Sequence, residues 1–96
     1  MKQIDTRPRW GTTDMALREE IRRFIRDSFL VDDFADDASF LATGLIDSLG
    51  IGQLVAFVES TYGIRVGNTD IVPDNFDSVA KLAAYVQREI KSTRTA

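Results

Sequence analysis

Residues 47–63 read DSLGIGQLVAFVESTYG, and this stretch marks both ends of a helix. Asp47 is a residue type that favours the N-cap, and Gly63 is typical of the position just past a helix end. Between them, apolar side chains recur at helical spacing. These side chains are Ile51, Leu54, Val55, Val58 and Tyr62. The stretch therefore predicts an amphipathic helix over residues 48–62 that packs against a core with one face.

Two more stretches, one on each side, share this period. The first covers residues 14–30 and has Leu17, Ile21, Phe24, Ile25 and Ser28 on its stripe. Thr12, Thr13 and Asp14 are equally good N-caps for it. The second begins after Asp77 and Ser78, extends to about residue 91, and has Val79, Leu82, Ala83, Val86 and Ile90 on its stripe.

The two connections between these helices differ in character. Residues 31–46 are rich in Asp, and we expect Phe34, Phe40, Leu41 and Leu45 to pin this long loop to the core. In the second connection, residues 68–70 are Asn, Thr and Asp, which favour N-cap positions. We therefore expect them to cap a one-turn helix near Ile71 and Val72. Pro73 should limit the length of that helix.

Three amphipathic helices, one short helix and a long first loop predict an all-α fold, a four-helix bundle. We expect an N-terminal tail over residues 1–13, one domain over residues 14–91 and a polar C-terminal tail over residues 92–96. A chain of 96 residues supplies a single core, and we expect a monomer.

Composition excludes several classes of function. The chain has no Cys and no His, so it lacks a thiol nucleophile, the commonest general base and the commonest zinc ligand. An internal Ser-His-Asp triad is excluded, and we expect neither an enzyme nor a metal site. No apolar run approaches the roughly 18 residues of a membrane span, and residues 1–13 lack the apolar core of a secretory signal. We therefore expect a cytoplasmic protein without a membrane span.

The net charge of −3 comes largely from the middle of the chain. Residues 31–47 contain Asp32, Asp33, Asp36, Asp37 and Asp47 and no basic residue. Nucleic-acid binding needs clustered Lys and Arg, so no nucleic-acid partner is expected. The Asp-rich loop lacks the pattern of a calcium loop, and is interpreted as a solvated acidic loop or a partner surface. Arg18, Arg22 and Arg26 are interpreted as the solvent face of the first helix.

Ser48 would lie in the first turn of its helix, directly after an acidic cap. Backbone N–H groups and the helix dipole converge there, so a phosphate on the hydroxyl would be stabilised. Leu45 and Leu49 bracket the serine, and we expect them to anchor the loop and helix to the core while the hydroxyl points outward. A purely structural interpretation is also open, in which Asp47 and Ser48 are only capping residues.

The triplet Asp47-Ser48-Leu49 resembles the attachment signature of acyl carrier and peptidyl carrier proteins. The resemblance spans roughly residues 15–90. Further similarities are Gly44-Leu45, Glu59, Tyr62-Gly63-Ile64 and Phe76-Asp77-Ser78-Val79. The resemblance implies an acyl-carrier-like four-helix bundle whose covalent cofactor is 4′-phosphopantetheine.

The resemblance also implies a mechanism and a set of partners. A phosphopantetheinyl transferase would move phosphopantetheine from coenzyme A onto Ser48 as a phosphodiester, and the base that activates Ser48 would belong to that enzyme. The thiol of the arm would carry acyl or aminoacyl groups as thioesters. Asp47 would help bind the transferase's metal–coenzyme site, or only cap the helix. An adenylating acyl or aminoacyl ligase would load the carrier, and downstream acyl-accepting enzymes would unload it.

The sequence departs from fatty-acid carriers, which show several acids after the serine. Here Gly50 follows Leu49, and Glu59 is the only acid in residues 48–62. Residues 47–54 are more similar to D-alanyl and other aminoacyl carriers, which indicates a specialised pathway. A housekeeping fatty-acid carrier and an unmodified helical interaction module are the alternatives. Gly50 and Gly52 either admit a partner's backbone or reflect a frayed first turn.

Overall fold

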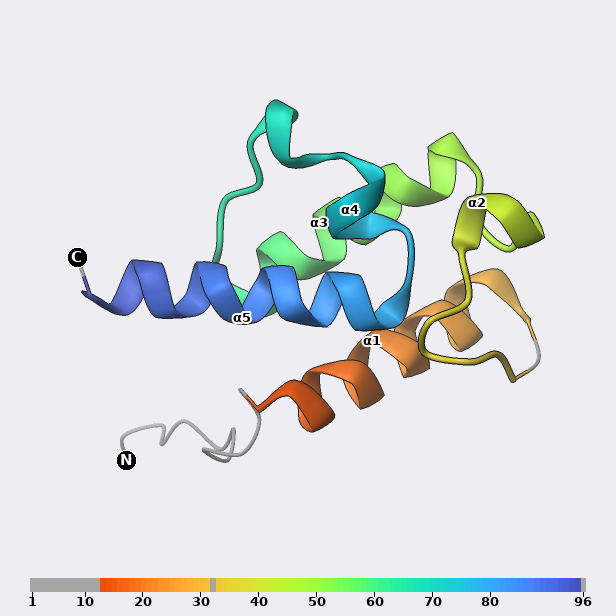
Figure 1. The fold of residues 1–96 in the computed structure, drawn as a ribbon, viewed down its shortest axis with the longest axis horizontal. Helices are drawn as coiled ribbons and strands as arrows, with labels where there is room; N and C mark the ends of the chain where they lie inside the picture. Colours follow the sequence, from red (N-terminus) through yellow and green to blue (C-terminus); the bar gives the residue numbers. More distant parts are fainter. Residues whose placement is uncertain (1–12, 32, 96) are drawn as a thin grey trace, which may run out of the picture.

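The structure is a computed structural model that describes residues 13–31 and 33–95. This part of the chain forms helices and no strand, which confirms the predicted all-α bundle (Figure 1). The elements are α1 (Asp14–Phe29), α2 (Phe40–Thr43), α3 (Ser48–Tyr62), η2 (Asn68–Asp70), α4 (Pro73–Phe76) and α5 (Val79–Thr95). The expected N-terminal tail lies outside the described residues except for Thr13.

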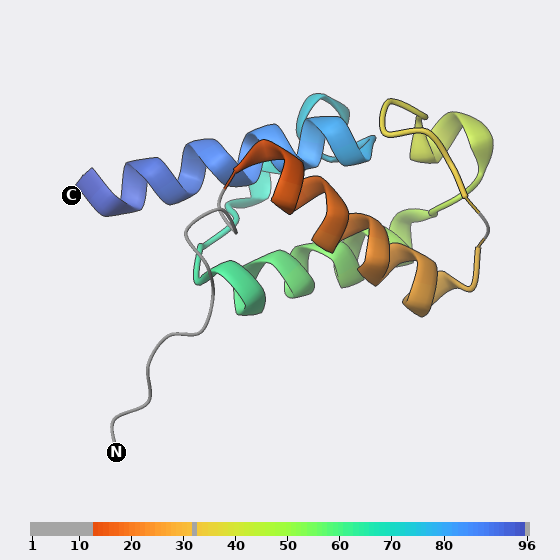
Figure 2. The ribbon, with the colours of Figure 1, turned by 90° about the horizontal axis from the view of Figure 1, so that it is seen from below.

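The three long helices enclose the core. α5 packs against α1 and α3, and Figure 2 shows α1 crossing obliquely between them. Apart from Phe40, Phe76 and Tyr85, the large fully buried side chains come from the predicted stripes. Each contributes about 1.5–3 kcal/mol through its burial. They include Leu17, Ile21 and Ile25 of α1, Leu54 and Val58 of α3, and Val79, Leu82 and Val86 of α5. Ser28, which was predicted on the α1 stripe, is exposed instead.

Helix ends largely follow the predicted caps. Thr13 is the N-cap of α1, and its Oγ1 accepts a hydrogen bond of 3.2 Å from the amide of Ala16. Asp47 and Gly63 bound α3 as predicted. Ser78 caps α5, because its Oγ accepts a hydrogen bond of 3.1 Å from the amide of Lys81. α5 itself continues to Thr95, beyond the predicted end near residue 91.

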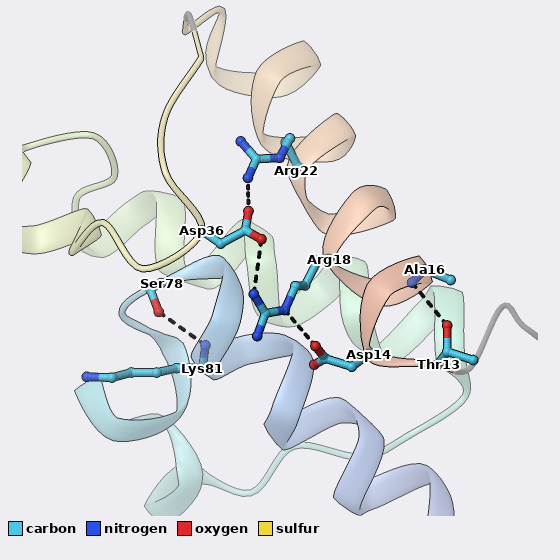
Figure 3. A network of polar contacts seen from close by, with 8 residues as sticks. All are labelled: Thr13, Asp14, Ala16, Arg18, Arg22, Asp36, Ser78 and Lys81. Atoms are coloured by element: carbon cyan, nitrogen blue, oxygen red, sulfur yellow. Dashed lines mark hydrogen bonds and ion pairs between the residues drawn. The ribbon is translucent and has the colours of Figure 1, made fainter.

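The long first loop is pinned by a charged network that the sequence analysis assigned to solvent (Figure 3). Asp36 pairs with Arg22 and, at 3.1 Å, with Arg18, and both arginines are half-buried. The guanidinium of Arg22 also lies 4.9 Å from the centre of the Phe34 ring. The predicted solvent face of α1 is therefore wrong for Arg18 and Arg22 and right for Arg26, which is exposed.

The loop also contains α2, a short helix that the sequence analysis did not predict. Ser39 is its N-cap and accepts a hydrogen bond of 3.0 Å from Ala42 N–H. Phe40 is fully buried and fixes the helix to the core. Gly44 ends the helix with φ +74°, a backbone conformation that glycine adopts without steric cost.

The prediction for the second connection was wrong in detail. Residues 68–70 form η2 themselves instead of capping a helix at Ile71 and Val72. Pro73 begins α4 instead of ending a helix, because a first-turn position needs no N–H donor and its fixed φ suits the helix. Two side chains hold this connection to the long helices. Glu59 accepts a hydrogen bond of 2.9 Å from Val66 N–H, and buried Tyr85 donates one of 2.9 Å to Asp70.

Candidate functional site

Ser48 is the first residue of α3 and is exposed to solvent. The backbone at this point is held by Asp47, whose carboxylate accepts a hydrogen bond of 2.9 Å from Gly50 N–H. The carbonyl of Asp47 also accepts one of 2.9 Å from Ile51 N–H. A capped helix start therefore presents the Ser48 hydroxyl to water, where a separate enzyme can reach it.

The expected anchoring role of Leu49 is wrong, because its side chain is 80% exposed. Leu45 is half-buried, as expected of an anchor. The first turn is held instead by Ile46, which is buried, and by Gly50, which packs against it. A Cβ on Gly50 would lie 2.4 Å from Cγ2 of Ile46 and 3.0 Å from the ring of Phe29.

The two glycines after Ser48 therefore have different surroundings. Gly50 is buried inside the molecule, so the idea that it admits a partner's backbone is wrong. Gly52 is exposed, and a Cβ there would meet no atom within 4 Å. The idea of close approach by a partner remains a prediction for Gly52 alone.

A small pocket opens beside Ser48, between the start of α3, α2 and α4. Its volume is about 260 Å³, and its walls are mostly apolar. It is lined by Leu41, Ser48, Ile51, Ile71, Val72, Pro73, Phe76 and Asp77. The pocket could not be predicted from the sequence, because three separate elements contribute to it.

Asp77 is the charged residue in the pocket wall, and it joins α2 to the start of α5. Its carboxylate accepts hydrogen bonds from Ser39 Oγ, at 2.5 Å, and from Leu41 N–H, at 3.0 Å. Burial by itself raises the pKa of Asp77, but these hydrogen bonds and the nearby charge of Lys81 outweigh that effect. The net result is a pKa below the ordinary value of 3.8, so the carboxylate is ionised at neutral pH.

The surface that surrounds Ser48 on α3 carries little charge. Glu59 is the only ionisable acid in the helix, and its carboxylate is engaged by Val66 N–H. In the described part of the chain, no cluster of His, Cys, Asp or Glu could hold a metal ion. None of the described helices is long and apolar enough to cross a membrane.

The all-helical fold with an exposed serine at a helix start is consistent with a carrier domain, and comparison with known families shows that class. The family model described as the phosphopantetheine attachment site matches residues 16–86 of the chain. The chain therefore belongs to the phosphopantetheine attachment site family. No curated protein matches it significantly.

Members of this family carry covalently attached 4′-phosphopantetheine. The residues at the start of α3 fit such a group. The Ser48 hydroxyl is accessible, the helix N-terminus favours an attached phosphate, and modification there would displace no core side chain. When bound, the group supplies the thiol that the cysteine-free chain lacks.

Proposed function

We propose that Ser48 holds the phosphopantetheine arm and that the chain carries acyl or aminoacyl thioesters to partner enzymes without catalysing a reaction itself. The observation that carries this proposal is an exposed serine at a helix start that Asp47 caps. A phosphopantetheinyl transferase would attach the arm, an adenylating ligase would load it, and downstream enzymes would accept the cargo. We propose that the chain does this as a cytoplasmic monomer.

Each residue near the attachment point has a separate part in this proposal. Asp47 holds the first turn of α3 in place and adds a carboxylate next to the reacting hydroxyl. Gly50 lets the helix pack closely on Ile46 and Phe29. Leu49 completes the attachment motif and, being exposed, is free to contact the transferase.

The pocket and the charge of α3 support a small cargo from a specialised pathway. Sites that enclose a drug-sized ligand have volumes of about 300–1,000 Å³, and the pocket beside Ser48, at about 260 Å³, is smaller. The scarcity of acids on α3 also weakens the long-range attraction that would steer basic partners. A housekeeping fatty-acid carrier is the second candidate, and an unmodified interaction module is the third.

A loading assay separates these candidates. The chain carrying its arm is incubated with ATP, adenylating ligases and one labelled substrate, either an amino acid, a short acyl acid or a long fatty acid, and thioester-bound label is measured. We expect more label from amino acids or short acyl groups than from long fatty acids. Ser48→Ala should abolish labelling, whereas Ser60→Ala, an exposed serine on the same helix, should not. Preferential loading with long fatty acids would contradict the proposed cargo.

A further inference from the structure

Leu30 has an unusual combination of backbone conformation and exposure. It ends α1 with φ +53° and ψ +47°, the left-handed conformation in which helices commonly end on glycine. It is the only described residue other than glycine with positive φ. A leucine there is sterically disfavoured, and its side chain is 87% exposed, so packing within the molecule does not offset that cost.

The position of Leu30 is close to the candidate attachment point. Figures 1 and 2 show the C-terminal end of α1 and the N-terminal end of α3 at the same end of the molecule. Contact between the two ends is direct, because a Cβ on Gly50 would lie 3.0 Å from the ring of Phe29. Leu30 directly follows Phe29, and Ser48 lies two residues before Gly50, so both lie near this contact. One partner covers roughly 800 Å² in a standard interface, enough to span neighbouring helix ends.

Exposed apolar side chains gather at this end. Of the six large apolar residues that are exposed in the described part of the chain, five belong to it. Leu49 follows Ser48, Leu30 follows Phe29, and the others share the pocket wall with Ser48. The five are Leu30, Leu41, Leu49, Ile71 and Val72, and the sixth is Met15 at the opposite end of α1. Apolar side chains gathered beside a reactive position are typical of an interaction site.

The charges near Leu30 indicate what kind of surface covers it. Asp27 and Asp33 are exposed on either side of it in sequence, and Arg26 is an exposed base nearby. Counted from the sequence, residues 26–33 contain three acids and one base, a net charge of −2. A complementary partner would offer an apolar recess for the leucine and basic groups around that recess.

We infer that Leu30 is a docking residue for the phosphopantetheinyl transferase, whose surface covers Leu30 with an apolar recess while its active site reaches Ser48. This inference rests on the proposed function of Ser48. Under the proposed function, the transferase is needed whatever the cargo, because it attaches the arm. A leucine retained in a disfavoured, exposed conformation beside the attachment point is explained by the contact it makes in that complex.

The test compares rates of arm attachment by a broad-specificity transferase with coenzyme A, followed by intact mass. Leu30→Gly removes the side chain and suits the left-handed backbone, so stability should be unchanged or higher while kcat/KM falls about fivefold to tenfold. The loss should appear in KM, because Leu30 contributes binding and touches no reacting atom. Leu30→Asn, which also tolerates this backbone, should behave in the same way, and Leu30→Met should retain most of the rate.

Met15→Ala is the matched control, because it removes another highly exposed apolar side chain at the far end of α1. It should load at the wild-type rate. Wild-type loading by Leu30→Gly and Leu30→Asn would overturn the docking role and leave the proposed function intact. An equal loss in Met15→Ala would also overturn it, since the effect would not be local. A wild-type chain that accepts no arm would instead refute the proposed function.

Discussion

Gly50 is the residue with the least room in the first turn of α3. An added Cβ would lie 2.4 Å from Cγ2 of Ile46, a buried β-branched side chain with few alternative rotamers. Alanine favours a helix by about 1 kcal/mol over glycine, but overpacking costs about 1–3 kcal/mol. The clash should prevail, so Gly50→Ala should lower the free energy of unfolding in urea denaturation.

Gly52→Ala is the control for that experiment. The helix is the same, but no atom lies within 4 Å of the added Cβ. We expect stability equal to or slightly above that of the wild type. If Gly50→Ala were as stable as Gly52→Ala, the described packing of Ile46 and Phe29 on α3 would be incorrect.

Asp77 should give the fold a dependence on acid pH. Its pKa is lowered in the folded state, so its stabilising effect is complete above the unfolded value of 3.8 and is lost as pH falls through the folded value. Asp77→Asn should cost about 1 kcal/mol at pH 6, through weaker hydrogen bonds to Ser39 and Leu41, and less at pH 3.

Denaturation of both proteins at the two pH values measures this difference. Asp33→Asn removes an exposed carboxylate and serves as the control, with little expected effect at either pH. If the free energies of unfolding of the wild type and Asp77→Asn differed by the same amount at both pH values, the assigned role of the ionised carboxylate would be contradicted.

At the scale of the element, the start of α3 combines a cap with a proposed functional carboxylate. Asp47→Ala should cost about 1 kcal/mol of stability, because Gly50 N–H loses its acceptor. Asp47→Asn keeps an acceptor at the same place and should be nearly as stable as the wild type. We nevertheless expect Asp47→Asn to accept the arm about tenfold more slowly, because the charge that would support the transferase's metal is gone.

Stability and the rate of arm attachment, measured on the same preparations, separate the two roles of Asp47. If Asp47→Asn accepted the arm at the wild-type rate, capping the helix would be the only role of Asp47. The same conclusion would follow if loading of the variants slowed only in proportion to their loss of stability.

The elements that the sequence predicts well are those with local signals. The α3 boundaries follow from Asp47 and Gly63, and the α1 and α5 cores follow from their apolar spacing. α2 was missed because it is four residues long and is stabilised from outside, by buried Phe40 and by Asp77. Pro73 was interpreted as a helix end, although proline is equally compatible with the first turn that it occupies.

At the scale of the whole molecule, long-range contacts decide what the sequence could not show. Asp36 was placed in a solvated loop, but the fold brings it against Arg18 and Arg22 of α1. Ser48 was predicted as the attachment point from a local motif. The pocket beside it was not predicted, because residues from Leu41 to Asp77 meet there only after folding.

The central claim is that the exposed hydroxyl of Ser48 accepts the phosphopantetheine arm, and intact-mass spectrometry tests it most directly. The purified chain is incubated with coenzyme A and a broad-specificity transferase, and peptide fragmentation locates any added group. We predict a gain equal to one phosphopantetheinyl group on Ser48, and no gain in Ser48→Ala. An unchanged wild-type mass, or an equal gain in Ser48→Ala, would contradict the claim.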